Sequence, residues 1–333
     1  MHLWEVEKNV ISRDLKGKYV LLYGKPKSGK TTAACSFPDA VLLAFEKGYN
    51  AIGDAYPFDI NKWSDFKMAL RDLEDNRSKE RFKTVIIDTV SICWEMCEKF
   101  ICQQNGVQKI SDVPWGAGYT ACKKEFESSI RRITQLGYGV VLIAHSASRV
   151  EKTADGSDVE IISPDLPKRA SEVCNGIVDI IGYIGNEWVN GERKRWLYTR
   201  ETPTLFAGSR FKYMPDKIPF GYDELVNAIA DAIEMAEKKD GATVVDTTKT
   251  KSETKLNFSE VREKAQNLWK QLVGEGENAQ PEVASAILKK IEMTMGRRMK
   301  LSEFTEDQVD ILTLVVYDME EMLKQQNGTE DKI

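Results

Sequence analysis

Short runs of apolar residues recur along the first half of the chain, with little polar alternation inside them. Such continuous runs are typical of strands that are buried on both faces, as in parallel sheets. Between the runs, apolar residues recur at helical spacing, as at Trp63, Phe66 and Leu70. This alternation predicts an α/β fold with a mostly parallel sheet. The four runs lie at 18–23, 40–45, 84–88 and 139–144.

The pattern changes after the fourth run. Residues 147–167 form a long polar segment in which Asp155-Gly156 could turn a hairpin. Segments of this length are usually functional or mobile. Further on, apolar strands at 176–184 and 195–200 flank Asn190-Gly191, which predicts a β-hairpin at the C-terminal side of the sheet. An amphipathic helix at 222–238 then completes the α/β part.

The residues after 238 fall into segments that differ in composition. A stretch low in apolar residues predicts a linker, and three amphipathic helices with capping signals predict a small all-α module. The predicted segments are an α/β core at 1–238, a flexible linker at 239–257, a helical domain at 258–327 and a disordered tail at 328–333.

The first strand leads directly into a phosphate-binding motif. Gly24-x4-Gly29-Lys30-Thr31 has the spacing of a phosphate loop, and it follows a strand and precedes helix-forming residues. Backbone N–H groups of such a loop bind phosphates, a lysine reaches the β- and γ-phosphates, and a hydroxyl binds Mg²⁺. The motif therefore predicts ATP and Mg²⁺ as cofactors. The residues expected to hold the nucleotide are Gly24, Lys25, Pro26, Lys27, Ser28, Gly29, Lys30, Thr31 and Thr32.

Polar residues that follow the other strands supply the remaining parts of a hydrolytic site. Asp88 ends the third strand and is expected to hold Mg²⁺ with Thr31. Glu46 follows the second strand and is expected to orient the attacking water, although a solvated glutamate would look the same. His145 ends the fourth strand and is expected to contact the γ-phosphate, with a buried structural histidine as the alternative. We therefore predict Lys30, Glu46 and His145 as catalytic residues.

Two further cations are candidates for the nucleotide site. Arg210 and Lys212 lie in an irregular segment and are predicted to reach the nucleotide of a neighbouring copy, as arginine fingers do. Basic pairs in loops are also commonly just solvated.

Composition limits the remaining choices. The formal net charge is −5, so any contact with nucleic acid must depend on local basic clusters rather than on bulk charge. No apolar run is long enough to span a bilayer and the N-terminus does not have the pattern of a signal peptide, which predicts a cytoplasmic protein. The six cysteines form no CxxC pair, and we expect reduced thiols rather than zinc ligands.

The order of these elements resembles the RecA-like ATPase core, and more closely the phage-encoded RecA-like AAA-type ATPases that act in recombination and single-strand annealing. The resemblance covers about residues 12–238 and does not extend to the helical tail. It implies that Glu46 takes the place of the catalytic carboxylate. His145 stands where the superfamily commonly has glutamine, which is a departure from the recombinase pattern.

The same resemblance implies that the segments 103–118 and 147–167 face DNA. Aromatic faces in such segments stack on bases, and basic side chains follow the phosphates. An aromatic residue of the first segment, Trp115, could instead be a loop anchor packed on the core. The residues predicted to bind DNA are Trp115, Tyr119, Arg149, Lys152, Lys168 and Arg169.

These observations predict a Mg²⁺-dependent, DNA-stimulated ATPase that binds single-stranded DNA and promotes annealing or strand pairing. We expect it to act as a homo-oligomer, either a filament or a ring, in the cytoplasm of the phage's host. The helical module would contact a partner such as a single-strand-binding protein, and no membrane is involved. The alternatives are a nucleotide-switch motor or helicase-loader-like ATPase, a phosphate-loop kinase, and a scaffold that binds ATP without cleaving it.

Overall fold

The structure is a computed structural model of the 333-residue chain, in which two compact units can be distinguished, Met1–Ser252 and Glu253–Ile333. Each unit is described by itself. The residues described are 10–12, 18–152, 156–245, 257–274 and 279–330.

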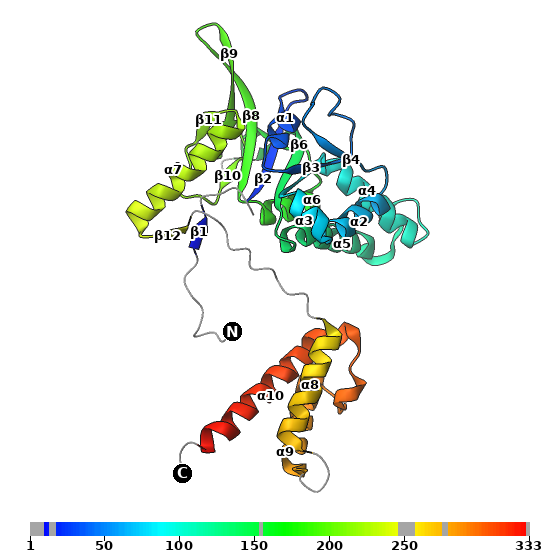
Figure 1. The fold of residues 1–333 in the computed structure, drawn as a ribbon. Coiled ribbons are helices and arrows are strands. Elements are labelled where there is room, and N and C mark those ends of the chain that lie inside the picture. Colours follow the sequence, from blue (N-terminus) through cyan, green and yellow to red (C-terminus); the bar gives the residue numbers. More distant parts are fainter. Residues whose placement is uncertain (1–9, 13–17, 153–155, 246–256, 275–278, 331–333) are drawn as a thin grey trace. The chain divides into compact units, whose positions relative to one another are not determined.

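One large mixed sheet forms the centre of the first unit (Figure 1). Its strands from β8 to β4 are all parallel, whereas β9 and β11 are antiparallel additions at one side. Two strands lie off this path, because β7 (Asp158–Pro164) pairs with β6 and β10 (Gly208–Ser209) pairs with β8. The main order is β11 (Lys217–Pro219), β9 (Glu192–Tyr198), β8 (Ile180–Val189), β2 (Tyr19–Gly24), β6 (Gly139–Lys152), β5 (Thr84–Asp88), β3 (Ala40–Ala44) and β4 (Tyr56–Asp59).

Helices cover both faces of this sheet, because its parallel strands are apolar on both sides. In β2, Leu21 and Tyr23 join one buried cluster, while Val20 and Leu22 join the other. The predicted fold class, an α/β core with a mostly parallel sheet, is confirmed. The first cluster includes residues of α2 (Trp63–Asp72), α4 (Val90–Gln104), α5 (Ala117–Gln135) and α6 (Lys168–Ile177), and the second includes residues of α1 (Lys30–Cys35) and α7 (Tyr222–Asp240).

Several elements depart from the predicted bounds. β6 does not end at His145 but continues to Lys152 and pairs with β7, so most of the polar segment 147–167 is a β-hairpin. A short helix, α3 (Asn76–Arg81), precedes β5. The predicted strand 176–184 was set too early, since residues 176 and 177 end α6 and the strand begins at Ile180.

The predicted linker was also set too early. Helix α7 runs to Asp240, and β12 (Thr243–Val245) pairs in parallel with β1 (Val10–Ser12). Residues 239–245 are therefore ordered parts of the first unit, and the rest of the predicted linker up to 256 lies outside the described residues.

The second unit consists of three helices around a core of its own. Leu268, Ile287 and Leu312 are buried in this core, one from each helix. Helix α10 continues to Glu330, so the tail predicted to be disordered from 328 is helical up to that residue, and 331–333 lie outside the described residues. The helices are α8 (Phe258–Val273), α9 (Pro281–Met295) and α10 (Val309–Glu330), with single 3-10 turns at Leu301–Glu303 and Glu306–Gln308.

Candidate nucleotide site

The register of the parallel strands brings the predicted site residues to one edge of the sheet. Gly24 at the end of β2 pairs with His145 on β6, and Ala44 at the end of β3 pairs with Asp88 on β5. The backbone N–H of Glu46 then donates to the Asp88 carbonyl at 3.2 Å. Ligands of open α/β sheets bind beyond the carboxyl ends of the strands, so this edge is the expected place for the site.

The phosphate loop, Gly24–Thr31, has the backbone that its two glycines allow. A Cβ atom at Gly24 would lie 2.8 Å from the carbonyl oxygen of Ile184, so no side chain fits there. Gly29 has a φ of 94°, a left-handed conformation that strongly favours glycine, and it caps α1. The sequence thus specifies both the close approach of β8 and the turn into the helix.

Lys30 is folded back over the phosphate loop. Its Nζ donates to the carbonyl oxygens of Gly24 and Lys25, each at 3.0 Å, and the residue is buried. Burial lowers the Lys30 pKa, while Asp88 and Glu46 oppose that shift. The ammonium group is therefore held at the loop, where a phosphate would neutralise it better than the present carbonyl groups do.

The residues predicted to hold Mg²⁺ are in direct contact. The Thr31 hydroxyl donates to Asp88 Oδ2 at 2.7 Å, and Asp88 is only 3% exposed. Hydroxyl and carboxylate oxygens suit Mg²⁺, which takes one or two protein ligands and completes its shell with phosphates and water. Among the described residues, no group of three or more His, Cys, Asp or Glu is placed to hold a metal ion.

Burial makes Asp88 an unfavourable anion in the isolated protein. Desolvation raises the Asp88 pKa and Glu46 adds to this, whereas the Thr31 hydroxyl, Lys30 and His145 lower it. Desolvation is the largest of these effects, so the net direction is upward. A divalent cation at this carboxylate would remove the penalty, and the donor pair therefore fits the predicted metal.

Glu46 and His145 face each other at the same edge. Glu46 Oε1 lies 3.6 Å from His145 Nε2, and each side chain is about one-third exposed, at 34% and 33%. His145 Nδ1 is buried and has no hydrogen-bond partner among the described residues. The Glu46 side chain is thus only partly solvated, and one ring nitrogen of His145 lacks a hydrogen-bond partner among the described residues.

The loop residues between the two glycines are mostly accessible. Lys25, Pro26 and Lys27 are exposed, as is Thr32 in the first turn of α1, whereas Ser28 is buried. The buried Ser28 hydroxyl has no hydrogen-bond partner among the described residues.

A family model described as AAA domain matches residues 16–211, which is more than half of the chain. The chain belongs to this AAA-domain family. The match spans the phosphate loop, Asp88 and His145, so the core is a P-loop domain of the AAA kind.

Two individual proteins are also similar to the chain. The SPbeta prophage-derived uncharacterized protein YorG of Bacillus subtilis (strain 168) is 28% identical over 331 residues, which cover 95% of this chain and 96% of the relative. A KaiC-like protein from Pyrococcus horikoshii OT3 aligns with a TM-score of 0.33 and 15% identity, covering 62% of this chain and 85% of that one.

The structure places Arg210 and Lys212 away from the phosphate loop of their own AAA domain. Arg210 pairs with Asp179, just before β8 at the opposite edge of the sheet, and Lys212 pairs with Asp240 at the end of α7. Neither side chain therefore lies at the nucleotide site of its own chain. A role toward a neighbouring copy stays a prediction.

Sequence reasoning missed a cation that does touch the phosphate loop. Arg195 on β9 donates from Nη1 to the Ser28 carbonyl at 3.2 Å. The sequence offered only a weak signal, since Arg195 stands in a hairpin with other basic residues and no local motif links it to Gly29. Only the pairing of distant strands brings it there.

Three of the residues predicted to bind DNA line one cavity of the AAA domain. Tyr119, Lys168 and Arg169 surround a space of about 430 Å³ together with Trp94, Pro167 and two glutamates. The Arg169 guanidinium lies 4.5 Å from the centre of the Tyr119 ring. The two glutamates are Glu98 and Glu172.

The other three predicted DNA residues lie outside this cavity lining. Arg149 on β6 contacts the segment that leads into the cavity lining. Its guanidinium donates to the carbonyl of Leu166, two residues before Lys168. Lys152 is exposed near the end of the β6–β7 hairpin. Trp115 is 101% exposed in the turn before α5, so it is not the packed loop anchor that was the alternative.

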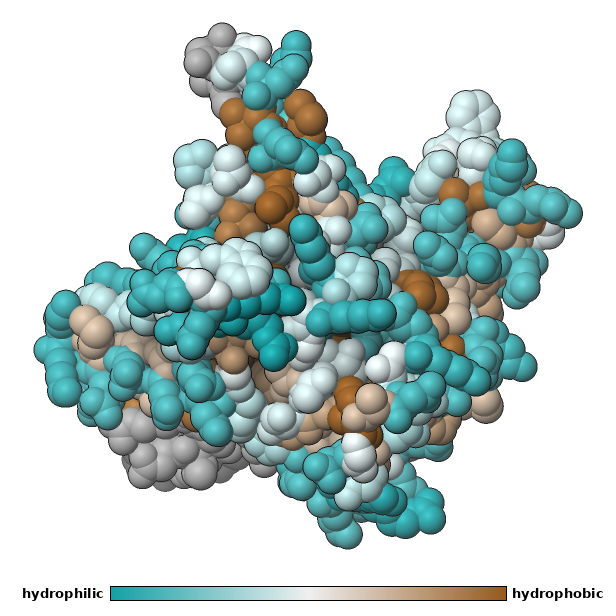
Figure 2. Space-filling model, turned by 90° about the horizontal axis from the view of Figure 1, so that it is seen from above, coloured by the Kyte–Doolittle hydropathy of each residue, from teal (hydrophilic) through white to brown (hydrophobic). Residues whose placement is uncertain are grey.

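The face of the molecule that lies at the top in Figure 1 is mostly polar. Hydrophilic and intermediate residues cover most of this face, and apolar residues gather in separate patches (Figure 2). A face of this kind suits charged and polar ligands better than a large apolar partner. Among the described residues, no helix combines the length and apolar character needed to cross a membrane.

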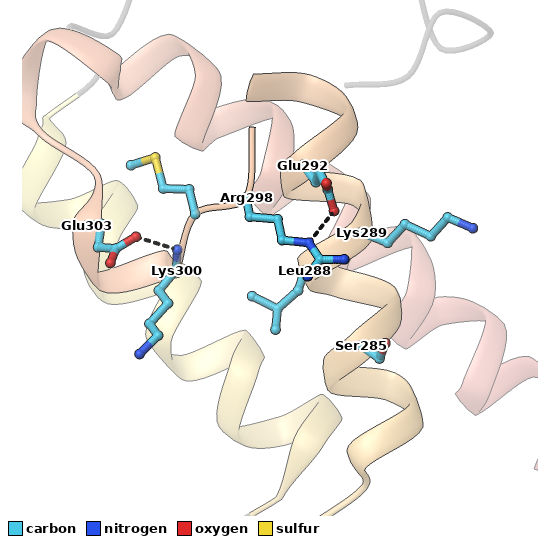
Figure 3. Close-up of a pocket in the computed structure, with 8 residues that line it drawn as sticks. Ser285, Leu288, Lys289, Glu292, Arg298, Lys300 and Glu303 are labelled. Atoms are coloured by element: carbon cyan, nitrogen blue, oxygen red, sulfur yellow. Dashed lines mark hydrogen bonds and ion pairs between the residues drawn. The ribbon is translucent and has the colours of Figure 1, made fainter. Parts of the chain in front are cut away.

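The helical unit has an open groove of about 600 Å³ between α9 and the turn that follows it. Its acidic groups are already engaged, since Glu292 accepts from Arg298 and Glu303 accepts from the Lys300 backbone N–H (Figure 3). The ammonium groups of Lys289 and Lys300 point in different directions (Figure 3). The groove therefore lacks a converging set of charges.

Proposed function

We propose that the chain is a Mg²⁺-dependent ATPase that binds single-stranded DNA and promotes annealing or strand pairing as an oligomer. The observation that carries the ATPase part is the convergence of Lys30, Thr31, Asp88, Glu46 and His145 at one sheet edge. These are the groups needed to neutralise phosphate charge, hold the metal and orient a nucleophile.

In this proposal each residue has a separate task. Lys30 leaves the loop carbonyls and binds the terminal phosphates. Thr31 and Asp88 would hold Mg²⁺, which would help to neutralise the phosphate charge. Glu46 orients the attacking water, and His145 contacts the γ-phosphate. The short distance between Glu46 and His145 supports a shared place for these two tasks.

The cavity around Tyr119 and Arg169 supports the DNA part. A guanidinium stacked on a partly buried aromatic ring provides both a face for a base and a charge for a phosphate. Lys168 adds a second cation beside it, and Trp115 offers a fully exposed ring in the preceding turn. Base stacking of this kind contributes about 1–3 kcal/mol per base and tolerates any sequence.

The setting of the protein is also part of the proposal. The B. subtilis relative is called prophage-derived, and we extend a phage origin and an action in the host cytoplasm to this chain. Assembly as a filament or ring would allow Arg210 and Lys212 to act on a neighbour's nucleotide. The helical unit would bind a partner such as a single-strand-binding protein.

ATP turnover tests the first part of the proposal. We expect Lys30→Ala to lower steady-state ATP hydrolysis by at least about 100-fold, because phosphate charge is no longer neutralised. Glu46→Gln should lower turnover similarly while leaving ATP binding intact. Lys79→Ala, an exposed lysine on α3, is the matched control. Turnover at the wild-type rate in Lys30→Ala would refute the proposed ATPase activity. Unchanged turnover in Glu46→Gln would favour a scaffold that binds ATP without cleaving it.

Binding of fluorescent oligo(dT), together with ATPase rates with and without it, tests the second part. We expect the DNA to stimulate hydrolysis and the double variant Lys168→Ala, Arg169→Ala to weaken binding about tenfold at low salt, with a smaller salt dependence. The double variant Arg71→Ala, Lys79→Ala removes the same charges from exposed positions on α2 and α3. Equal binding by both double variants would contradict the assigned DNA site. ATPase activity that no DNA alters would favour a nucleotide-switch motor or helicase loader.

A further inference from the structure

The β8–β9 hairpin projects past the phosphate loop as an arm. β2 ends at Gly24, which pairs with Ile184, but β8 continues to Val189 and beyond Ile184 pairs only with β9. The hairpin therefore rises beyond the carboxyl edge of the sheet near α1 (Figure 1). Four residue pairs of this arm, from Asn186 and Arg195 to Val189 and Glu192, have no third strand beside them in the register.

Arg195 is on the face of the arm that meets the phosphate loop. Its Nη1 lies 3.2 Å from the Ser28 carbonyl oxygen and 2.7 Å from the position that a Cβ of Gly29 would take. The residue is exposed, and no ion pair with a carboxylate is found for it among the described residues. Its charge is therefore available to a ligand.

Phe220 completes a wall on the same side. A ring carbon of Phe220 lies 3.4 Å from the same Cβ position at Gly29, and the ring centre lies 5.9 Å from the Arg195 guanidinium. The Phe220 N–H also donates to the Arg195 carbonyl, so the backbone fixes the two residues together. A guanidinium and an aromatic ring thus border the helix-capping glycine of the loop.

The strand order gives the direction in which a bound nucleotide must run. Asp88 on β5 and Glu46 after β3 mark the metal and γ-phosphate end. β8 lies on the other side of β2 from β6, β5 and β3. A triphosphate held by the loop with its γ end over β5 directs its nucleoside end toward β8, where Arg195 and Phe220 stand.

We propose that Arg195, held beside Phe220, binds the α-phosphate of the nucleotide in its own chain and so forms the nucleoside-side wall of the site. This inference depends on the proposed nucleotide binding and extends it to a residue outside the motif. Because ATP and ADP both carry the α-phosphate, Arg195 contributes equally to binding of the two.

Calorimetric titration of the full chain with ADP and with a non-hydrolysable ATP analogue tests this assignment. We expect Arg195→Ala to lower the affinity for both ligands by the same factor of about ten or more, because a charge-assisted hydrogen bond is lost. Arg195→Lys should restore part of the affinity. Arg193→Ala is the matched control, since Arg193 lies on the same face of the arm two residue pairs further out. It should bind both ligands as the wild type does.

Unchanged ADP affinity in Arg195→Ala would overturn the inference, and so would a loss confined to the ATP analogue, which would indicate a contact with the γ-phosphate. If Arg195→Ala does not fold, Arg195→Gln keeps a side chain of donor character and is read in the same way. Failure of the wild type to bind either nucleotide would instead refute the proposed function. If Lys30→Ala loses nucleotide binding but Arg195→Ala does not, only this inference is refuted.

Discussion

At the scale of single residues, the site keeps two charges where the surrounding protein disfavours them. Desolvation raises the pKa of Asp88 and lowers that of Lys30, although the two groups partly stabilise each other. Both groups would be better neutralised by a metal ion and a phosphate than by the neighbours they have. Burial therefore destabilises the charged forms of both groups, and binding of Mg²⁺ and a phosphate would relieve this effect.

Asp88→Asn should stabilise the nucleotide-free protein. A carboxyl group whose folded pKa is raised contributes favourably when protonated, and that contribution is lost as the pH rises through the folded pKa. At pH 8 we expect the variant to melt at a higher temperature than the wild type, with a difference that shrinks as the pH falls toward the ordinary carboxylate range.

Scanning calorimetry without nucleotide measures this difference, and Asp54→Asn is a matched control because it removes an exposed carboxylate. Mg²⁺ and ATP should raise the melting temperature of the wild type but not that of Asp88→Asn. A melting temperature at pH 8 that is equal to or below the wild-type value would show that Asp88 is not a buried, penalised anion.

At the scale of elements, two strands of the sheet continue past its carboxyl edge and carry residues to the site. β6 brings His145 to the edge and then forms a hairpin with β7, and β8 continues into the arm that carries Arg195 to the phosphate loop. The turn residues Asn190 and Gly191 predict that the second hairpin exists, and both have positive φ. The length of either arm follows from cross-strand pairing, which no local pattern encodes.

At the scale of the whole chain, the two compact units have separate cores. We expect calorimetry to resolve two unfolding transitions, since units with independent cores unfold as independent cooperative blocks. Ile287→Ala, which truncates a fully buried side chain of α9, should destabilise only one transition, by about 2–5 kcal/mol. Mg²⁺ and ATP should raise only the other transition.

A matched control for this experiment is Leu288→Ala, which truncates the neighbouring and partly exposed side chain, and it should have a much smaller effect. A single transition that both Ile287→Ala and nucleotide shift would contradict the independence of the two units.

The sequence alone determined the parallel sheet and the phosphate loop, because continuous apolar runs and glycine spacing are local properties that each specify one backbone conformation. It also indicated Glu46, Asp88 and His145, since residues that end parallel strands must meet at one edge. Only the tertiary structure decided that Arg195 touches the loop and that Arg210 pairs with Asp179 at the opposite edge. Those placements depend on which strands lie side by side and in what register, and such long-range pairing leaves no trace in the spacing of neighbouring residues.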